Sequence, residues 1–145
     1  MSERIRTIAA YLCVDDAKRA IAYYTEAFGA EETFRLEEPS GRIGHAEMRI
    51  GTSTLMLSDE YPDHDARSPK AIGGSPVLLY LPVDDADAVA ARAVKAGGTL
   101  RAPVADQFYG ERTGTLVDPF GHRWMISQHI EDVSPEEMKR RMAAM

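Results

Sequence analysis

An internal repeat constrains this chain more than any other feature of its sequence. The segment LCVDDAKRAIAYYTEAFGA, which begins at Leu12, returns as LPVDDADAVAARAVKAGGT from Leu81, with eight of nineteen positions identical at a constant offset of 69. Repetition at a fixed offset indicates that one supersecondary unit occurs twice. In each copy an aspartate follows a strand end and precedes an alanine-rich helix and a closing glycine. We therefore predict that Asp15 and Asp84 are helix N-caps.

Three stretches with the alternation of β-strands follow each predicted helix. They lie near 32–36, 45–50 and 54–58 in the first half, and near 99–103, 113–117 and 123–128 in the second. With the strand that precedes each helix, both halves read strand, helix, strand, strand, strand. We predict an α+β fold in which residues 1–145 form a single domain of two tandem βαβββ modules, at about 4–59 and 76–129.

Two segments lie outside the repeat. The linker at 60–75 is rich in proline, glycine and charge, which is typical of a plain mobile connection and equally of a lid. The tail at 134–145 opens with Ser134 as N-cap and Glu137 placed to close a capping box, so it predicts a short C-terminal helix. Its methionines share one stripe, which we expect to pack on the body or on a partner chain: Met138, Met142 and Met145.

Composition excludes several classes of partner. The chain has 23 acidic and 17 basic residues and a formal net charge of -6, and its basic residues are scattered except in MKRRM near the end. We therefore expect no nucleic-acid partner. No apolar run approaches the roughly 18 residues of a membrane span, so we expect no membrane partner. Cys13 is the single cysteine, which rules out an intramolecular disulfide and favours a cytoplasmic location.

Four segments carry a resemblance to a known family: YLCVDDAKRAIAYYTEAFGAE, GHAEMRIGTSTLMLSDE, DQFYGERTGTLVDPFGHRW and EDVSPEEMKRR. Together with the tandem module plan, they resemble the vicinal oxygen chelate superfamily of glyoxalases, bleomycin resistance proteins and extradiol dioxygenases, and within it the PhnB-like branch. The resemblance implies a curved mixed sheet around a cleft, with the helices outside. It also implies a homodimer, and in many members a metal ion in the cleft.

The resemblance places the metal ligands of such members on four strands, and this chain has Ala9, Met56, Leu78 and Met125 at those positions. Alanine and leucine offer no donor, and a thioether suits soft metals such as copper(I). The assignment is internally consistent because Ala9 and Leu78, like Met56 and Met125, are 69 residues apart. We therefore expect no metal and no other cofactor; the alternative is a divalent metal held elsewhere.

Strand alternation then predicts which residues line the cleft. Tyr11 and Tyr80 are in phase with the four positions and 69 residues apart, so we expect the two phenols to face each other across the cleft, although tyrosine is equally common at the edge of a core. The residues out of phase form an apolar set expected beneath the helices: Ile8, Leu12, Leu55, Leu57, Leu79, Leu81, Trp124 and Ile126.

The stretch HAEMRI alternates, with His45, Glu47 and Arg49 on one face and apolar residues on the other. His45 and Glu47 can form an acid–base pair, bind a polar ligand, ligate a displaced metal, or belong to a solvated polar face. In the loop DQFYGERTG, Phe108 and Tyr109 can stack on a planar ligand while Arg112 holds an anionic group; the alternative is a plain turn.

Three classes of function follow from these residues. The first is a metal-free protein that binds a planar or anionic small molecule between Tyr11, Tyr80, Phe108 and Tyr109. The second is an enzyme with glyoxalase-like or dioxygenase-like chemistry that uses His45 and Glu47, with or without a metal. The third is a structural or regulatory module with a closed cleft.

Overall fold

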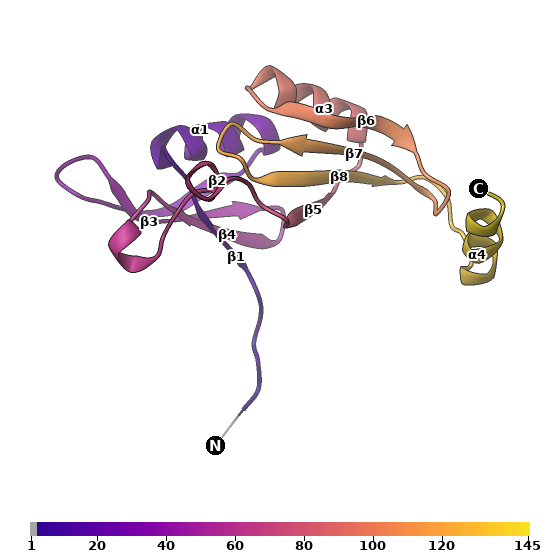
Figure 1. Ribbon diagram of the computed structural model, residues 1–145, viewed down its shortest axis with the longest axis horizontal. Helices are drawn as coiled ribbons and strands as arrows, with labels where there is room; N and C mark the ends of the chain where they lie inside the picture. The colour runs from indigo at the N-terminus through magenta and orange to yellow at the C-terminus, as the bar shows by residue number, and fades with distance from the viewer. Residues whose placement is uncertain (1–2) are drawn as a thin grey trace.

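The computed structural model describes residues 3–145 and contains two modules with the same order of elements (Figure 1). The first module consists of β1 (Ala10–Cys13), α1 (Ala17–Phe28), β2 (Glu31–Glu37), β3 (Ile43–Ile50) and β4 (Ser53–Ser58). The second consists of β5 (Leu78–Pro82), α3 (Ala86–Lys95), β6 (Thr99–Asp106), β7 (Glu111–Val117) and β8 (Arg123–His129). The predicted α+β fold of tandem βαβββ modules is confirmed.

Each module forms its own four-stranded mixed sheet. The strand orders are β1-β4-β3-β2 and β5-β8-β7-β6, and in each sheet the first pair is parallel while the other two pairs are antiparallel. The parallel pairs require a crossover, which α1 and α3 provide. The repeat at offset 69 is therefore a repeat of one complete sheet with its helix.

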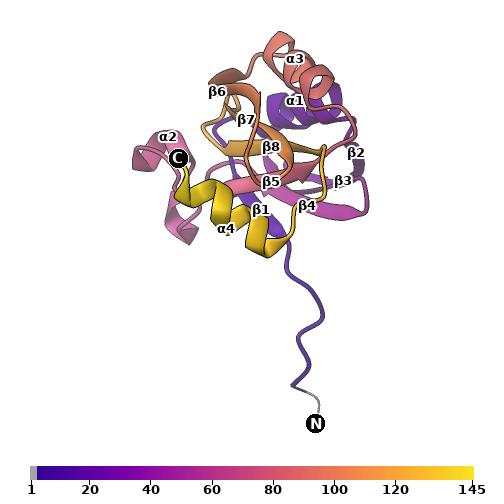
Figure 2. The ribbon, with the colours of Figure 1, turned by 90° about the vertical axis from the view of Figure 1, so that its right-hand side faces the viewer.

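The helices α1 and α3 lie side by side over one face of the two sheets (Figures 1 and 2). Most of the apolar set predicted beneath them is buried or half-buried, and Leu57 and Ile126 have no exposed surface. Ile8 differs, because it precedes β1 in an extended segment that leads away from the body and leaves 94% of this residue exposed. The other face of each sheet, called the open face below, carries Tyr11 and Tyr80, which are 52% and 53% exposed.

The helix caps lie one residue later than the sequence pattern indicates. Asp16 accepts a hydrogen bond from the Arg19 amide at 3.2 Å, and Asp85 accepts one from the Ala88 amide at 3.0 Å. The prediction of Asp15 and Asp84 as caps is wrong, because each helix begins only at the alanine after the second aspartate. Asp15 instead pairs with Lys70 in the linker at 3.2 Å.

The linker is partly structured. It contains the 3₁₀ helix η1 (Pro62–His64) and the short helix α2 (Pro69–Ile72), and an isolated β-bridge joins Tyr61 to Ala66. Ser68 caps α2 and is fully buried. The linker therefore folds against the body at its first half and at Ser68.

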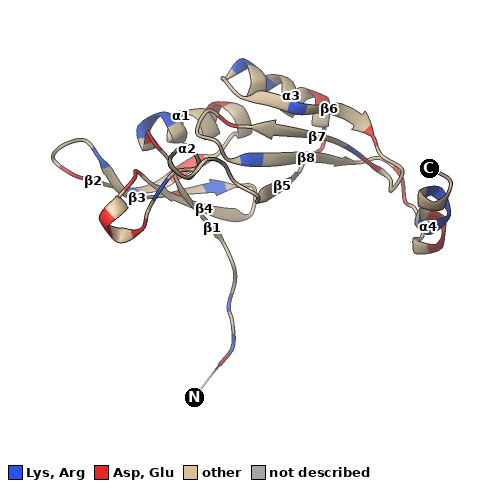
Figure 3. Cartoon of the chain, viewed as in Figure 1, with Lys and Arg blue, Asp and Glu red and all other residues tan. Residues whose placement is uncertain are grey.

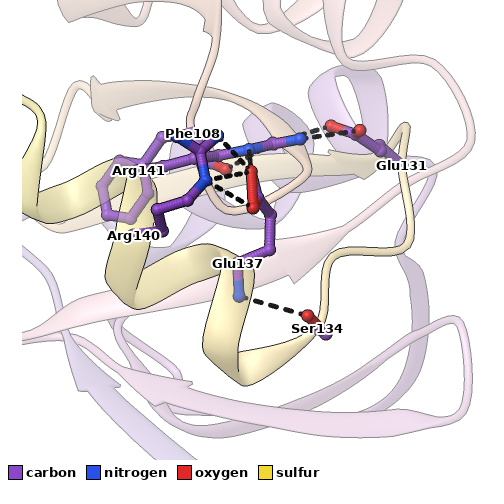
Figure 4. Close-up of polar contacts among 6 residues, drawn as sticks. All are labelled: Phe108, Glu131, Ser134, Glu137, Arg140 and Arg141. Atoms are coloured by element: carbon purple, nitrogen blue, oxygen red, sulfur yellow. Dashed lines mark hydrogen bonds and ion pairs between the residues drawn. The ribbon is translucent and has the colours of Figure 1, made fainter.

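The tail forms α4 (Pro135–Ala143), which lies at the far end of the second module (Figures 1 and 4). Ser134 caps it as predicted, by accepting from the Glu137 amide at 3.1 Å. The Glu137 carboxylate binds Arg140 and Arg141 rather than closing a capping box, because both guanidinium groups lie within one helical turn.

Arg141 holds α4 to the second module. It donates to the carbonyl of Phe108 and forms two hydrogen bonds with Glu131, at 2.9 to 3.0 Å (Figure 4). Of the methionine stripe, Met138 is half-buried against the body, whereas Met142 and Met145 are 65% and 85% exposed in this single chain. None of the helices within residues 3–145 has the length and apolar content needed to cross a bilayer.

Candidate functional site

A row of four side chains crosses the open face of the first sheet. The strand registers pair Tyr11 with Met56, Met56 with Glu47, and Glu47 with Phe34. Paired residues on neighbouring strands project from the same face, so the row has an aromatic ring at each end. Met56 lies in its middle, which places one of the four metal-ligand positions between Tyr11 and Glu47.

His45, two residues before Glu47 on β3, connects two members of this row, Tyr11 and Glu47. Its Nδ1 lies 2.8 Å from the Tyr11 hydroxyl and its Nε2 lies 2.8 Å from Glu47 Oε2. With Glu47 ionised and the imidazole neutral, Nε2–H donates to the carboxylate and Nδ1 accepts from the phenol. The structure therefore brings together Tyr11, His45 and Glu47 and links them in a single hydrogen-bonded chain.

Aromatic rings flank the imidazole on two sides. The ring centroids of Tyr11 and Phe34 lie 5.4 Å and 6.1 Å from that of His45. Phe34 is 48% exposed, and the His45 side chain retains 24% of its exposure. Sequence reasoning missed Phe34, although Phe34 and Leu36 lie two positions apart on a predicted strand and so share a face, as an apolar pair. The site is thus a solvent-accessible, partly aromatic surface with one polar centre.

A second cluster occupies the open face of the second sheet. Tyr80 pairs with Met125 in register and donates its hydroxyl proton to Glu111, which also accepts from Ser127 at 2.7 Å. The hydrogen bond to Glu111 raises the pKa of Tyr80 and lowers the pKa of Glu111. Sequence reasoning missed Glu111 because the predicted strand begins at Thr113, whereas β7 begins at Glu111 itself.

The aromatic loop lies beside this second cluster. Phe108 and Tyr109 contact each other edge to face at 5.2 Å, and a cavity of about 460 Å³ is lined by Tyr109, Glu111 and residues leading into α4. Tyr109 therefore adjoins the Tyr80–Glu111 pair. The hydrogen bonds of the Tyr11 and Tyr80 hydroxyls run to different clusters, one on each sheet.

Arg112 lies on the helix-covered side of β7. It donates two hydrogen bonds to Asp87 on α3, at 2.9 and 3.0 Å, and one to Asp106 at 2.9 Å. These carboxylates raise its pKa further. The placement corrects the expectation that Arg112 faces the cleft with Tyr80, because neighbouring residues on a strand point to opposite faces and Glu111 takes the open one.

The residues at the family's metal positions do not suit a hard divalent ion. Met56 and Met125 offer only thioethers, and Ala9 and Leu78 offer no donor. Among residues 3–145, the histidine, cysteine and carboxylate side chains form no group of three or more that could hold an ion. Tyr11, His45 and Glu47 supply donors, but these three already satisfy one another.

His122, His129 and Cys13 serve the structure rather than a site. His122 Nε2 lies 2.8 Å from the Cys13 carbonyl, and His129 Nε2 lies 2.7 Å from Asp132. Burial, together with Glu60 and Asp59, raises the pKa of the Cys13 thiol to about 11. Cys13 is therefore a thiol, not a thiolate, at neutral pH.

Tandem βαβββ modules, each a four-stranded mixed sheet with its helix on one face, are typical of the glyoxalase and dioxygenase type of fold. The family model "Glyoxalase/Bleomycin resistance protein/Dioxygenase superfamily" matches residues 4–126, and the chain belongs to this superfamily. An uncharacterized protein of Mycobacterium bovis, Mb0911c, is 39% identical over 140 residues, which cover 94% of this chain and 92% of that protein.

Two solved structures show the same fold. Protein PA1353 from Pseudomonas aeruginosa superimposes with a TM-score of 0.70 at 24% identity, covering 88% of this chain and 100% of that one. A PhnB protein from Bacillus cereus gives 0.67 at 20% identity, covering 85% and 99%. The neighbours thus include the PhnB-like branch that the sequence resembles.

Proposed function

We propose that this protein binds a planar small molecule on the open face of the first module and needs no metal to do so. The observation that carries the proposal is the hydrogen-bonded chain Tyr11–His45–Glu47, set between the rings of Tyr11 and Phe34. The rings supply flat apolar contact, and the chain supplies a fixed donor and acceptor pattern. The anionic group that Arg112 would hold is left out, because Arg112 is engaged by Asp87 and Asp106.

The expected affinity follows from two contributions. Each aromatic contact is worth about 0.5–1.5 kcal/mol beyond area burial, and a hydrogen bond to a charged group about 1.5–3 kcal/mol. Since about 1.4 kcal/mol is a factor of ten in the dissociation constant, these contacts added to ordinary apolar burial give micromolar binding. No metal coordination is required to reach that range.

The test is a thermal-shift screen of planar aromatic compounds, followed by titration of a hit against variants. Tyr11→Phe and His45→Ala should each weaken the hit at least tenfold. Arg112→Gln, on the helix-covered face, is the control and should bind unchanged. Elemental analysis on protein prepared without a metal-affinity column should find less than about 0.1 divalent ion per chain. Equal binding by all three variants, or one zinc, nickel, iron or manganese per chain, contradicts the proposal.

An enzymatic role is the second candidate, and the same hydrogen bonds favour it. Glu47 fixes the imidazole so that Nδ1 points at the Tyr11 hydroxyl, which is the arrangement of a general base behind a phenol. A ligand whose acidic C–H bond lies at the Tyr11 oxygen would lose that proton to the Tyr11–His45 pair and regain a proton at another carbon, which isomerises it. Deuterium uptake from heavy water into a screening hit, lost in His45→Ala and Glu47→Gln, distinguishes this role from simple binding.

Two further properties belong to the proposal. We infer a homodimer, supported by the exposed Met142 and Met145 on α4 and by the exposed tyrosines of both open faces. In such a dimer, Tyr80, Phe108 and Tyr109 of the second module form a second wall of the binding site. The change in ligand affinity caused by Tyr80→Phe measures the contribution of this wall. A cytoplasmic location is supported by Cys13 being the only cysteine.

A further inference from the structure

The linker builds one wall of a separate cavity at the end of the first open face. This cavity, called the linker pocket below, has a volume of about 590 Å³ and adjoins the site through Tyr11, which lines both. Its walls come from β1 to β4 and from the linker: Tyr11, Leu36, Glu37, Glu38, Gly44, Ser58, Tyr61, His64 and Ala66. The volume falls within the range of about 300–1,000 Å³ that small-molecule sites occupy.

The linker wall is held in place by several contacts. Tyr61 and Ala66 exchange two backbone hydrogen bonds, at 2.8 and 3.1 Å, which close the loop around η1. The Tyr61 hydroxyl donates to Glu38 Oε2, and the Arg42 guanidinium lies 4.2 Å from the centroid of the Tyr61 ring. Because three independent contacts fix Tyr61, the first half of the linker is a wall of the pocket.

Gly44 leaves the space in which a ligand can sit. A Cβ at this position would lie 3.6 Å from the Tyr61 hydroxyl and 3.7 Å from the Leu36 carbonyl, which is ordinary contact distance. A methyl group is therefore tolerated, while a larger side chain fills the gap between β3 and Tyr61. The position offers a way to block the pocket without straining the backbone.

The lining defines the chemistry of the occupant. Tyr11, Leu36 and Tyr61 provide flat or apolar walls, and Leu36 is 59% exposed in this chain. Glu38 provides an acceptor. Its Oε2 accepts a hydrogen bond from the Tyr61 hydroxyl, while its Oε1 has no hydrogen bond or ion pair within residues 3–145. Neither lysine nor arginine is among the lining residues, so a carboxylate ligand would meet the negative charge of Glu38.

We propose that the linker pocket binds an aromatic group bearing an O–H or N–H donor, which Glu38 Oε1 accepts. The inference rests on the proposed function and names the ligand class: a planar molecule whose phenol or aromatic amine enters the pocket while the rest lies over Tyr11 and Phe34. The Tyr11 ring separates the two parts of the site and contacts both. Glu38 and Tyr61 are then the residues that select the ligand.

The experiment uses small probes in place of the unknown ligand. Phenol, anisole and benzoate are titrated into ¹⁵N-labelled full-length protein, and the amide shifts of Gly44, Ser58 and Ala66 are followed. Anisole keeps the ring and oxygen of phenol but has no donor, so it should bind about tenfold more weakly. Benzoate should cause no saturable shift at these amides.

Variants tie the result to the pocket. Gly44→Val should abolish the phenol shifts. Glu38→Gln keeps an amide oxygen that can accept from Tyr61 but removes the charged acceptor. This variant should therefore reduce the preference for phenol over anisole. Glu31→Gln, an exposed carboxylate on the same sheet paired with Arg49, is the matched control and should leave both unchanged. If Gly44→Val does not fold, Glu38→Gln alone decides.

Different results would contradict the linker pocket and the proposed function. His45→Ala should weaken a planar screening hit yet leave the phenol shifts at Ser58 and Ala66 intact. Equal binding of phenol and anisole, saturable benzoate binding, or phenol shifts confined to residues around Tyr80 overturns the linker pocket. None of these outcomes bears on whether Tyr11, His45 and Glu47 bind a ligand.

Discussion

The Tyr24 hydroxyl on α1 donates to Asp118 Oδ2 at 2.6 Å, so a fully buried hydrogen bond joins the helix of the first module to the β7–β8 turn of the second. The same carboxylate accepts from Trp124 Nε1 at 2.9 Å and from the backbone amides of Phe120 and His122. Asp118 belongs to the VDPFG turn, whose sequence predicts only a bend. The structure adds that this turn locks the two modules together.

Removing the Tyr24 hydroxyl should therefore weaken the whole domain. We expect Tyr24→Phe to lower the free energy of unfolding by about 1–3 kcal/mol, because Asp118 loses one of four donors in a buried place. Asp118→Ala should cost more, since four donors lose their acceptor. Urea unfolding followed by Trp124 fluorescence measures both, and Tyr109→Phe, which removes a half-buried hydroxyl, is the control. A Tyr24→Phe protein as stable as the control would show that the hydrogen bond makes no net contribution to the free energy of unfolding.

The same tyrosine predicts how stability depends on alkaline pH. Burial and the neighbouring Asp118 raise the pKa of Tyr24 well above 10, and burial likewise raises that of Tyr23. The unfolded chain loses these protons from about pH 10 while the folded chain keeps them, so the stabilisation is complete below pH 10 and is lost as the pH rises. Unfolding measured from pH 8 to 11.5 should show the fall, and Tyr24→Phe should reduce its slope. An unchanged slope would assign the effect to other groups.

The corrected helix caps give a paired test. We expect Asp16→Ala and Asp85→Ala each to lower stability by about 0.5–2 kcal/mol, because the first-turn amides of Arg19 and Ala88 lose their acceptor. Asp15→Ala and Asp84→Ala change the adjacent residue in the same way and should cost less. Thermal melts of the four variants measure the differences. A larger loss at Asp15 and Asp84 would return the cap to the first aspartate.

The attachment of α4 to the second module should depend on Arg141 more than on Arg140. Arg141 joins α4 to Phe108 and Glu131, whereas the hydrogen bonds of Arg140 lie within the helix (Figure 4). Arg141→Ala should speed amide hydrogen exchange in both 105–111 and 135–143, and Arg140→Ala should not. Exchange read by mass spectrometry distinguishes them. Equal effects would mean that charge on the helix, rather than the contact with the loop, fixes the tail.

The proposed homodimer is tested by measuring the molar mass of the protein in solution. Multi-angle light scattering at micromolar concentration should give about twice the 16.0 kDa chain mass, because the open faces and the α4 methionines leave large apolar side chains exposed. Met142→Glu with Met145→Glu should shift the mass toward the monomer if α4 takes part. A monomer for the unchanged protein at 100 μM contradicts the homodimer.

The repeat made most of the fold predictable, because a period of 69 fixes the element order of the second half once the first is read. Alternation also placed His45 and Glu47 on one face of their strand, and the structure shows Tyr11 hydrogen-bonded to His45 on that face. The expected role of Arg112 beside the aromatic loop is wrong, because β7 begins two residues earlier than predicted and its first open-face residue is Glu111. The caps failed for a related reason: in an Asp-Asp pair, only the helix start decides which carboxylate lies three residues before a free amide.

Other features had no sequence signal at all. The contact of Tyr24 with Asp118 spans 94 positions, and the linker pocket depends on a β-bridge between Tyr61 and Ala66 within an irregular loop. Unlike the dispersed charge, which the sequence already shows and which Figure 3 displays along the ribbon, these two contacts appear only in the folded chain. Such features arise from tertiary packing, which periodicity does not encode.

The equivalence of Tyr11 and Tyr80 has a consequence for how such a protein changes over time. Both hydroxyls sit at the same place in a duplicated unit, yet one is bonded to an imidazole and the other directly to a carboxylate. Duplication thus gave the chain two copies of one starting surface, and each copy now has its own chemistry. A substitution beside one tyrosine leaves the hydrogen bonds of the other intact, so the two copies can change independently of each other.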